Sequence, residues 1–169
     1  MPTTASASTP TPVSGLLPVE EEVIGMFVNA VKILGIPKSV GEIYGLLYIA
    51  PDPVTLDALV SRLGISKGSA SQGLKVLRAF GAVKQVYVPG DRRDHYAAET
   101  ELKKLVAGFI REEIKPRLEA GAGRIERLKS LAAGDASERG EFYQFRISKL
   151  AQWHARSQSL MPLISGMLD

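Results

Sequence analysis

Residues 54–99 read VTLDALVSRLGISKGSASQGLKVLRAFGAVKQVYVPGDRRDHYAAE, and this stretch decides the fold. A short helix is predicted after Thr55, whose hydroxyl can accept a backbone N–H at the helix start. Gly64 ends that helix, since glycine readily adopts positive φ, and Ser66 caps a second helix. The apolar residues of the first helix recur at helical spacing: Leu56, Leu59, Val60 and Leu63.

The second helix is predicted from about Lys67 to Phe80, with two chemically different sides. At about 100° per residue, one side carries Ala70, Leu74, Leu77 and Gly81. The other side carries small and polar residues: Gly68, Ser69, Gln72, Lys75 and Ala79. Small residues let the backbone approach another surface, and serine and glutamine can hydrogen-bond base edges. Val76 also points outward and fits either a thymine methyl group or packing on a strand.

A hairpin follows the second helix. Residues 83–88 alternate with the period of two expected for a strand, Pro89–Gly90–Asp91 is turn chemistry, and residues 96–99 return as a second strand. Two arginines lie at the tip, where an arginine can enter a narrow minor groove. Asp91 and Asp94 are expected to hold these arginine side chains in place.

This order of elements predicts a winged helix-turn-helix, which places one helix in the DNA major groove and a hairpin against the backbone or minor groove. Ser66 and Lys67, at the positive end of the second helix, suit a phosphate. A solvated helix that is merely rich in small residues is the competing interpretation, as is a charged loop that only aids solubility. The candidate DNA contacts are Ser66, Lys67, Gly68, Ser69, Gln72, Lys75, Arg78, Arg92, Arg93 and His95.

Residues 41–99 resemble the MarR superfamily, and within it the GbsR-like branch of regulators. The resemblance is strongest at residues 45–47, at GISKGSAS of residues 64–71, and at GDRR with HY in the hairpin. It implies a dimeric DNA-binding regulator in which the second helix is the recognition helix and Arg92 and Arg93 belong to the wing. Some members of this branch respond to choline-like osmolytes, which makes choline or glycine betaine a candidate effector.

Composition restricts the class of protein. The 169-residue chain has no cysteine and only two histidines, at positions 95 and 154, so a thiolate, a disulfide or a metal cluster is not expected. No apolar run approaches the roughly 20 residues of a membrane span, and no signal-peptide pattern is present, which predicts a cytoplasmic protein. The net charge of +3 is unevenly distributed, because residues 62–95 contain seven basic and two acidic side chains. This excess predicts salt-dependent binding to phosphates.

The predicted fold is mainly α with a small β-wing: a winged helix-turn-helix with N- and C-terminal dimerisation helices. Its parts are a flexible tail at 1–15, an N-terminal helix within 16–38, the DNA-binding domain at 39–100, and a helical region at 101–169. Ser39 and Glu42 are expected to form a capping box, and Pro116 to kink a long helix that Thr100 caps. The buried stripe of the N-terminal helix is predicted as Val19, Val23, Met26, Phe27, Ala30 and Leu34.

The terminal helices are too apolar to be fully solvated, which favours a homodimer, although intramolecular core is the alternative. Aromatic residues are candidates for an effector pocket that binds a quaternary ammonium group by cation–π attraction; plain core packing competes with this interpretation. These candidates are Tyr44, Tyr48, Phe109, Phe142, Tyr143, Phe145 and Trp153. No catalytic motif, cofactor or metal site is predicted. The favoured function is a dimeric regulator, most simply a repressor; a winged-helix module for protein assembly or RNA contact is the alternative.

Overall fold

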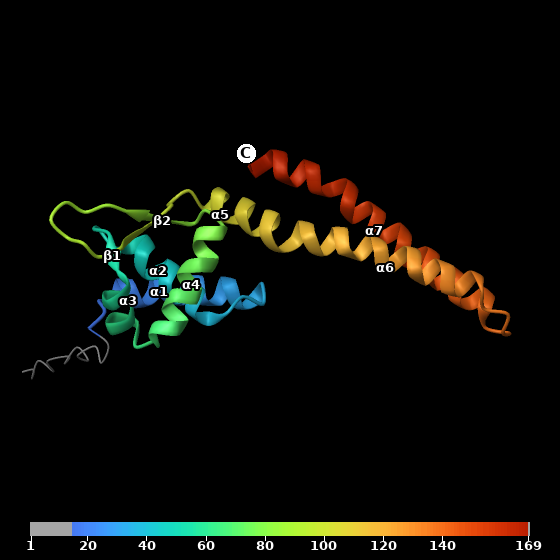
Figure 1. The fold of residues 1–169 in the computed structure, drawn as a ribbon, viewed down its shortest axis with the longest axis horizontal. Helices are drawn as coiled ribbons and strands as arrows, with labels where there is room; N and C mark the ends of the chain where they lie inside the picture. The colour runs from blue at the N-terminus through green and yellow to red at the C-terminus, as the bar shows by residue number, and fades with distance from the viewer. Residues whose placement is uncertain (1–14, 169) are drawn as a thin grey trace, which may run out of the picture. The chain divides into compact units, whose positions relative to one another are not determined.

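The computed structural model describes residues 15–168, which divide into two compact units (Figure 1). The first unit comprises residues 15–78 and 83–100, and the second comprises residues 79–82 and 101–168. The fold is mostly helical with a small antiparallel sheet, as predicted. Except for Gly15, the predicted flexible tail lies outside the described residues.

Two helices, α1 (Pro18–Ile33) and α2 (Lys38–Ile49), pack closely in the first unit. Glycines on α2 make this approach possible: a Cβ on Gly41 would lie 2.8 Å from the Cα of Val28, and one on Gly45 would lie 2.7 Å from the Cα of Ile24. Both positions therefore need a residue without a side chain. The fully buried Ile43 and Leu46 place α2 at the centre of the unit.

The buried side of α1 differs from the prediction. Val19, Met26 and Leu34 are exposed, whereas Ile24 and the charged Glu20 are buried. Glu20 is buried because its carboxylate is satisfied on two sides: the Leu17 N–H donates to it at 2.9 Å, and the Arg62 guanidinium donates to both oxygens at 2.7 and 2.8 Å. Periodicity alone assigned the apolar residues inward, whereas in the fold Ile24 packs on Gly45 of α2 and Glu20 pairs with the distant Arg62.

The predicted capping box at Ser39 is wrong. Helix α2 begins two residues earlier, with Pro37 rather than Ser39 at the N-cap position and no side-chain cap, and Glu42 instead pairs with Lys38 at 2.6 Å. This is an ordinary i,i+4 contact along one helix face.

The predicted helix-turn-helix is present. Helix α3 (Leu56–Leu63) is capped by the Thr55 hydroxyl, which accepts from the Ala58 N–H at 3.3 Å, and Gly64 follows with φ of 63°. Helix α4 (Lys67–Ala79) is capped by Ser66, whose Oγ accepts from the Ser69 N–H at 3.1 Å. Both predicted caps are thus confirmed.

A three-stranded antiparallel sheet completes the first unit, in the order β1–β3–β2. Strands β2 (Val83–Val86) and β3 (His95–Ala98) form the predicted hairpin, and the two-residue β1 (Val54–Thr55), too short to show a period, pairs with β3. The strand predicted to reach Val88 stops at Val86. Beyond it the chain turns at Pro89 and at Gly90, whose φ is 84°, and the Asp91 N–H donates to the Val88 carbonyl at 3.2 Å.

The second unit is helical: α5 (Leu102–Phe109), a π-helical turn η1 (Ile110–Ile114), α6 (Lys115–Ala133) and α7 (Gly140–Leu168). Pro116 was expected to kink a long helix, and it lies directly after the π turn, in which the Lys115 N–H donates to the Ile110 carbonyl. A π turn here accommodates the residue that lacks an N–H donor. One boundary prediction is wrong, since Glu101 rather than Thr100 precedes α5. The last helix, α7, starts at Gly140.

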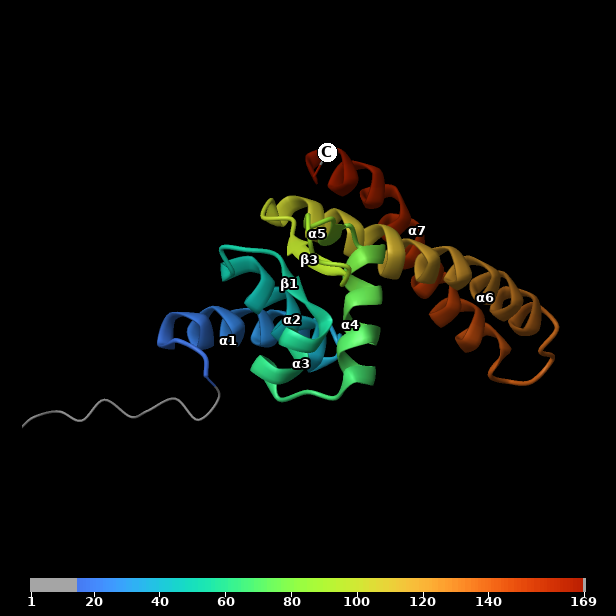
Figure 2. The same cartoon turned by 60° about the vertical axis from the view of Figure 1, so that its left-hand side comes forward.

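Helices α6 and α7 form an antiparallel hairpin, with the two helices side by side in both views (Figures 1 and 2). The His154 Nε2 donates to the Leu118 carbonyl at 2.8 Å, and Gly121 leaves the space that this ring occupies. Much of the apolar surface of α7 is exposed, including Phe142, Phe145, Leu150, Trp153 and Leu160. The hairpin therefore has an uncovered apolar face.

Candidate nucleic-acid interface

The exposed side of α4 carries the residues predicted for it. Ala70, Gly73, Leu74 and Leu77 are buried, while Gly68, Ser69, Gln72, Lys75 and Arg78 are exposed. Gly73, which the helical wheel left unassigned, is buried against Ile43. The packing is so close that a Cβ on Gly73 would lie 2.5 Å from Ile43 Cδ1. The outward surface thus presents an amide, two cations and bare backbone without large side chains, so it can approach another surface closely.

The start of α4 is held by local hydrogen bonds. The Ser66 Oγ accepts the Ser69 N–H at 3.1 Å and donates to the Ser69 Oγ at 2.9 Å, which leaves the Ser69 hydroxyl proton free to point outward. Lys67 Nζ lies 3.2 Å from Asp57 Oδ1 of α3, and both side chains are exposed. An exposed pair of this kind is weak, so Lys67 can exchange Asp57 for a phosphate at low cost.

The two arginines of the hairpin tip differ in their surroundings. The Arg93 Nε donates to the two Asp91 oxygens at 2.9 and 3.0 Å, and the Arg93 backbone N–H donates to Asp91 Oδ1 at 3.0 Å. The side-chain bonds from Arg93, then its backbone N–H, hold the pKa of the Asp91 carboxyl well below its usual range. Arg92 is exposed and makes no hydrogen bond or ion pair with another described residue. Asp91 therefore holds one arginine as expected, while Asp94 accepts from Gln85 Nε2 at 2.6 Å and holds neither.

The structure does not fit a direct contact by His95. Only 7% of this residue is exposed, because it lies on β3 between β1 and β2 and its ring turns back into the hairpin. Its Nδ1 lies 2.9 Å from the Arg93 carbonyl, and its Nε2 lies 3.4 Å from Asp91 Oδ2. A position beside two arginines in sequence had suggested exposure, but the strand pairing buries the side chain.

Tyr87 was not among the predicted contacts, although it is 84% exposed at the base of the hairpin tip. Together with Arg92 and Asp94 it lines a shallow hollow on the hairpin. A tyrosine two residues before a Pro–Gly turn was the signal in the sequence. The alternating pattern of residues 83–88 instead assigned Tyr87 to the strand.

The aromatic residues proposed for an effector pocket have separate settings. Tyr44 is buried in the first unit against Phe27 and Tyr48, and its hydroxyl donates to the Glu99 carbonyl at 2.6 Å. Burial, followed by the charges of Tyr48 and Glu99, raises the pKa of Tyr44 to about 12. Phe109 packs edge-on against Phe80 in the second unit. Phe142, Tyr143, Phe145 and Trp153 are exposed on α7.

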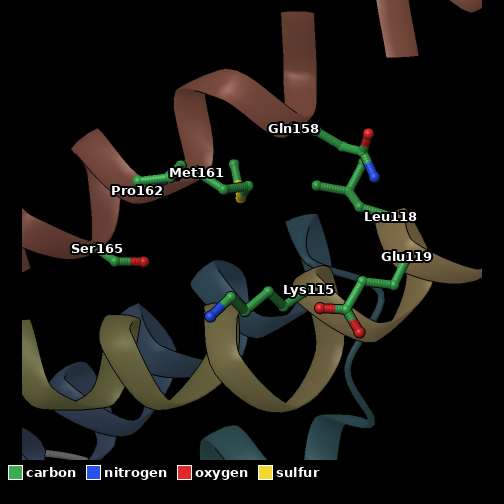
Figure 3. Close-up of a pocket in the computed structure, with 7 residues that line it drawn as sticks. All are labelled: Lys115, Leu118, Glu119, Gln158, Met161, Pro162 and Ser165. Atoms are coloured by element: carbon green, nitrogen blue, oxygen red, sulfur yellow. The ribbon is translucent and has the colours of Figure 1, made fainter. Parts of the chain in front are cut away.

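A hollow of about 240 Å³ lies between α6 and α7 (Figure 3). It is lined by Lys115, Leu118, Glu119, Gln158, Met161, Pro162 and Ser165. None of these is aromatic, so this hollow is not the predicted aromatic pocket. No group of histidine, cysteine, aspartate and glutamate suitable for a metal ion occurs among residues 15–168. No helix of this range has the length and apolar character to cross a membrane.

A capped two-helix motif, an exposed small-residue face on its second helix and a β-hairpin with arginines at its tip together define a winged helix-turn-helix. Comparison with known families agrees: residues 33–94 match the model of the MarR family, so this part of the chain is similar to that family. The solved crystal structure of a transcriptional regulator aligns with 89% of this chain and 96% of its own, with a TM-score of 0.59 and 19% identity, and so has the same fold.

Three relatives from Bacillus subtilis (strain 168) are similar in sequence. The HTH-type transcriptional repressor GbsR is 30% identical over 108 residues, 64% of this chain and 59% of the repressor. The HTH-type transcriptional repressor OpcR is 29% identical over 48% of this chain and 44% of its own. The putative HTH-type transcriptional regulator YvaV is 28% identical over 48% and 46%. The chain thus spans about half the length of these relatives.

Proposed function

We propose that this protein is a dimeric, sequence-specific DNA-binding regulator of transcription that acts as a repressor. The observation that carries the proposal is the exposed face of α4, where Ser69, Gln72 and Lys75 stand beside bare backbone. A face without bulky side chains fits the major groove, and glutamine can pair with adenine through two hydrogen bonds. Similarity to the repressors GbsR and OpcR supports the sign of regulation.

The contacts divide by chemistry. Ser66 and Lys67 at the start of α4 bind a phosphate, Gln72 reads bases, and Lys75 and Arg78 approach the backbone further along the helix. In the wing, Arg92 reaches the minor groove, where the potential is most negative. Arg93 supports the wing through its hydrogen bonds to Asp91, and it contributes less than Arg92 to the contact with DNA.

Dimerisation is the second part of the proposal. Two α4 helices about one DNA turn apart require a two-fold partner. The exposed apolar side chains of α7, with Trp153 at 69% exposure, and those of α1 offer surfaces for such a partner. Sedimentation at several protein concentrations tests this part, and a monomer throughout would contradict it.

DNA binding is tested on the DNA upstream of the protein's own gene, across a salt series. Gln72→Ala should cost about 1–3 kcal/mol at the cognate site and relax base preference, because it removes a base contact. Arg92→Ala should weaken binding to all sequences and reduce the salt slope by about one. Urea unfolding of each variant controls for general damage to the fold. Wild-type affinity in both Gln72→Ala and Arg92→Ala would show that the assigned faces are wrong.

Tight binding to RNA without binding to duplex DNA would favour the alternative winged-helix role in RNA contact or protein assembly. An osmolyte-like effector such as choline or glycine betaine is proposed from family resemblance, together with the exposed aromatic residues of α7. Its test is a shift of the DNA-binding curve on addition of choline, and loss of that shift in Trp153→Ala.

A further inference from the structure

The hairpin tip contains a small network centred on the Asp91 carboxylate. Arg93 binds it through Nε and through the backbone N–H, and His95 Nε2 faces it at 3.4 Å. The network spans residues 91–95 and brackets Arg92, the tip cation without a partner among the described residues. The backbone of Arg92 therefore depends on the anchors on either side of it.

The hydrogen bonds determine where the protons of His95 lie. A carbonyl oxygen can only accept, so the Nδ1 at 2.9 Å from the Arg93 carbonyl carries a proton. In a neutral ring the Nε2 then has a lone pair, and this lone pair faces Asp91 Oδ2. The Asp91 carboxyl remains ionised, because the hydrogen bonds from Arg93 hold its pKa far below the usual range, so it has no proton to share.

In neutral His95, the Nε2 lone pair therefore faces the Asp91 Oδ2 lone pairs, and no hydrogen bond forms between the two atoms. A protonated ring has a second N–H, which can donate to Asp91 while Nδ1 keeps its bond to the Arg93 carbonyl. The two bonds would connect β3 to both ends of the segment that contains Arg92.

Other charged groups near His95 do not replace this contact. Arg62 from α3 and Asp52 from the α2–β1 connection line the same hollow as His95 and Arg93. Arg62 is engaged by Glu20, and Asp52 is exposed to solvent. On the neighbouring strands His95 pairs with the uncharged Thr55 and Val86.

We infer that His95 is a positioning residue of the wing: its protonated ring grips Asp91 and thereby orders the segment that presents Arg92 to DNA. This inference rests on the proposed function. It separates His95, which acts through Asp91, from the residues that touch the nucleic acid, and it makes DNA affinity depend on proton uptake at a buried site.

The first test needs no DNA and follows the Arg93 backbone N–H and Nε–H resonances from about pH 8 to about pH 5.5, where histidine ordinarily changes charge. Both groups donate to Asp91, so both should shift in the wild type. The shift should vanish in His95→Asn, whose amide can still donate to the Arg93 carbonyl. It should persist in His154→Gln, which removes the chain's other histidine in the second unit. Equal shifts in His95→Asn and wild type would overturn the inference.

The second test measures the dissociation constant for upstream DNA at the same two pH values and constant salt. Wild-type and His154→Gln affinities should rise by roughly threefold to tenfold towards low pH, with at most one proton bound per wing. His95→Asn should show no such rise. Asp91→Asn keeps His95 and should also lose the pH dependence of DNA affinity. This second variant tests the same contact if His95→Asn does not fold.

Asp91→Asn also gives a test of sign. It removes a negative charge beside the DNA, so electrostatics alone predicts tighter binding, whereas loss of the anchor predicts weaker binding than the wild type at low pH. Tighter binding by Asp91→Asn would overturn the inference. Failure of the wild type to bind DNA at any pH would instead contradict the proposed function and leave the resonance test to decide the role of His95.

Discussion

Gly45→Ala probes the closest helix contact in the first unit. The added Cβ would lie 2.7 Å from the Cα of Ile24, 3.2 Å from its Cγ1 and 3.3 Å from its N, whereas ordinary van der Waals contact begins at 3.4 Å. Two of these atoms are backbone, so no side-chain rotation relieves the clash and the helices must separate. Overpacking of this kind costs about 1–3 kcal/mol.

The same substitution also has a favourable term. Alanine is preferred over glycine inside a helix by about 1 kcal/mol. Gly25 provides the matched control, because it lies inside α1 and a Cβ there meets nothing within 4 Å. Gly25→Ala should therefore raise the free energy of unfolding by up to about 1 kcal/mol. The difference between the two variants isolates the steric cost, which we expect to be about 1–3 kcal/mol.

Urea unfolding followed by circular dichroism measures both variants at one protein concentration, since dimerisation makes apparent stability depend on concentration. Gly45→Ala should have a lower midpoint than the wild type and Gly25→Ala a higher one, with the urea dependence unchanged. If Gly45→Ala is as stable as Gly25→Ala, then α1 and α2 do not approach as closely as described.

Further predictions concern caps, charges and the π turn. Ser66→Ala should destabilise by about 1 kcal/mol through loss of the α4 cap, whereas Ser66→Asp should keep the stability and weaken DNA binding by repelling a phosphate; similar DNA affinity in the two variants would contradict the assignment. Burial raises the pKa of Glu20, but the hydrogen bonds from Arg62 and Leu17 and the charge of Arg62 outweigh it and leave the pKa below its usual 4.5. The stabilisation by ionised Glu20 is therefore complete above that value and lost as the pH falls through the lower, folded-state value. Glu20→Gln should cost about 1–3 kcal/mol at neutral pH and reduce the acid sensitivity of unfolding, and an unchanged acid profile would argue against the ion pair. Pro116→Ala should convert the π turn to regular α-helix, seen as an i→i−4 bond pattern by amide NMR, and raise the melting temperature; a retained π turn would show that the proline is not its cause.

Local chemistry in the sequence was sufficient to predict the helix caps and turns of the winged helix-turn-helix. The Thr55 and Ser66 caps, the positive φ of Gly64 and the turn at Pro89–Gly90 occur as predicted. Each depends on atoms within four residues of one another, so the necessary information lies in a short window. The exposed face of α4 follows from helical periodicity for the same reason.

Tertiary structure alone decided the features that join distant segments. Arg62 pairs with Glu20 from 42 positions away, and Ile24 packs on Gly45 of α2, so contacts with other segments decide the inward side of α1. Pairing with β1 and β2 buries His95, which sequence proximity had placed among the tip residues. Burial and ion pairing depend on which groups meet across the fold, and a local pattern records only that a residue is apolar or charged, not what will cover it.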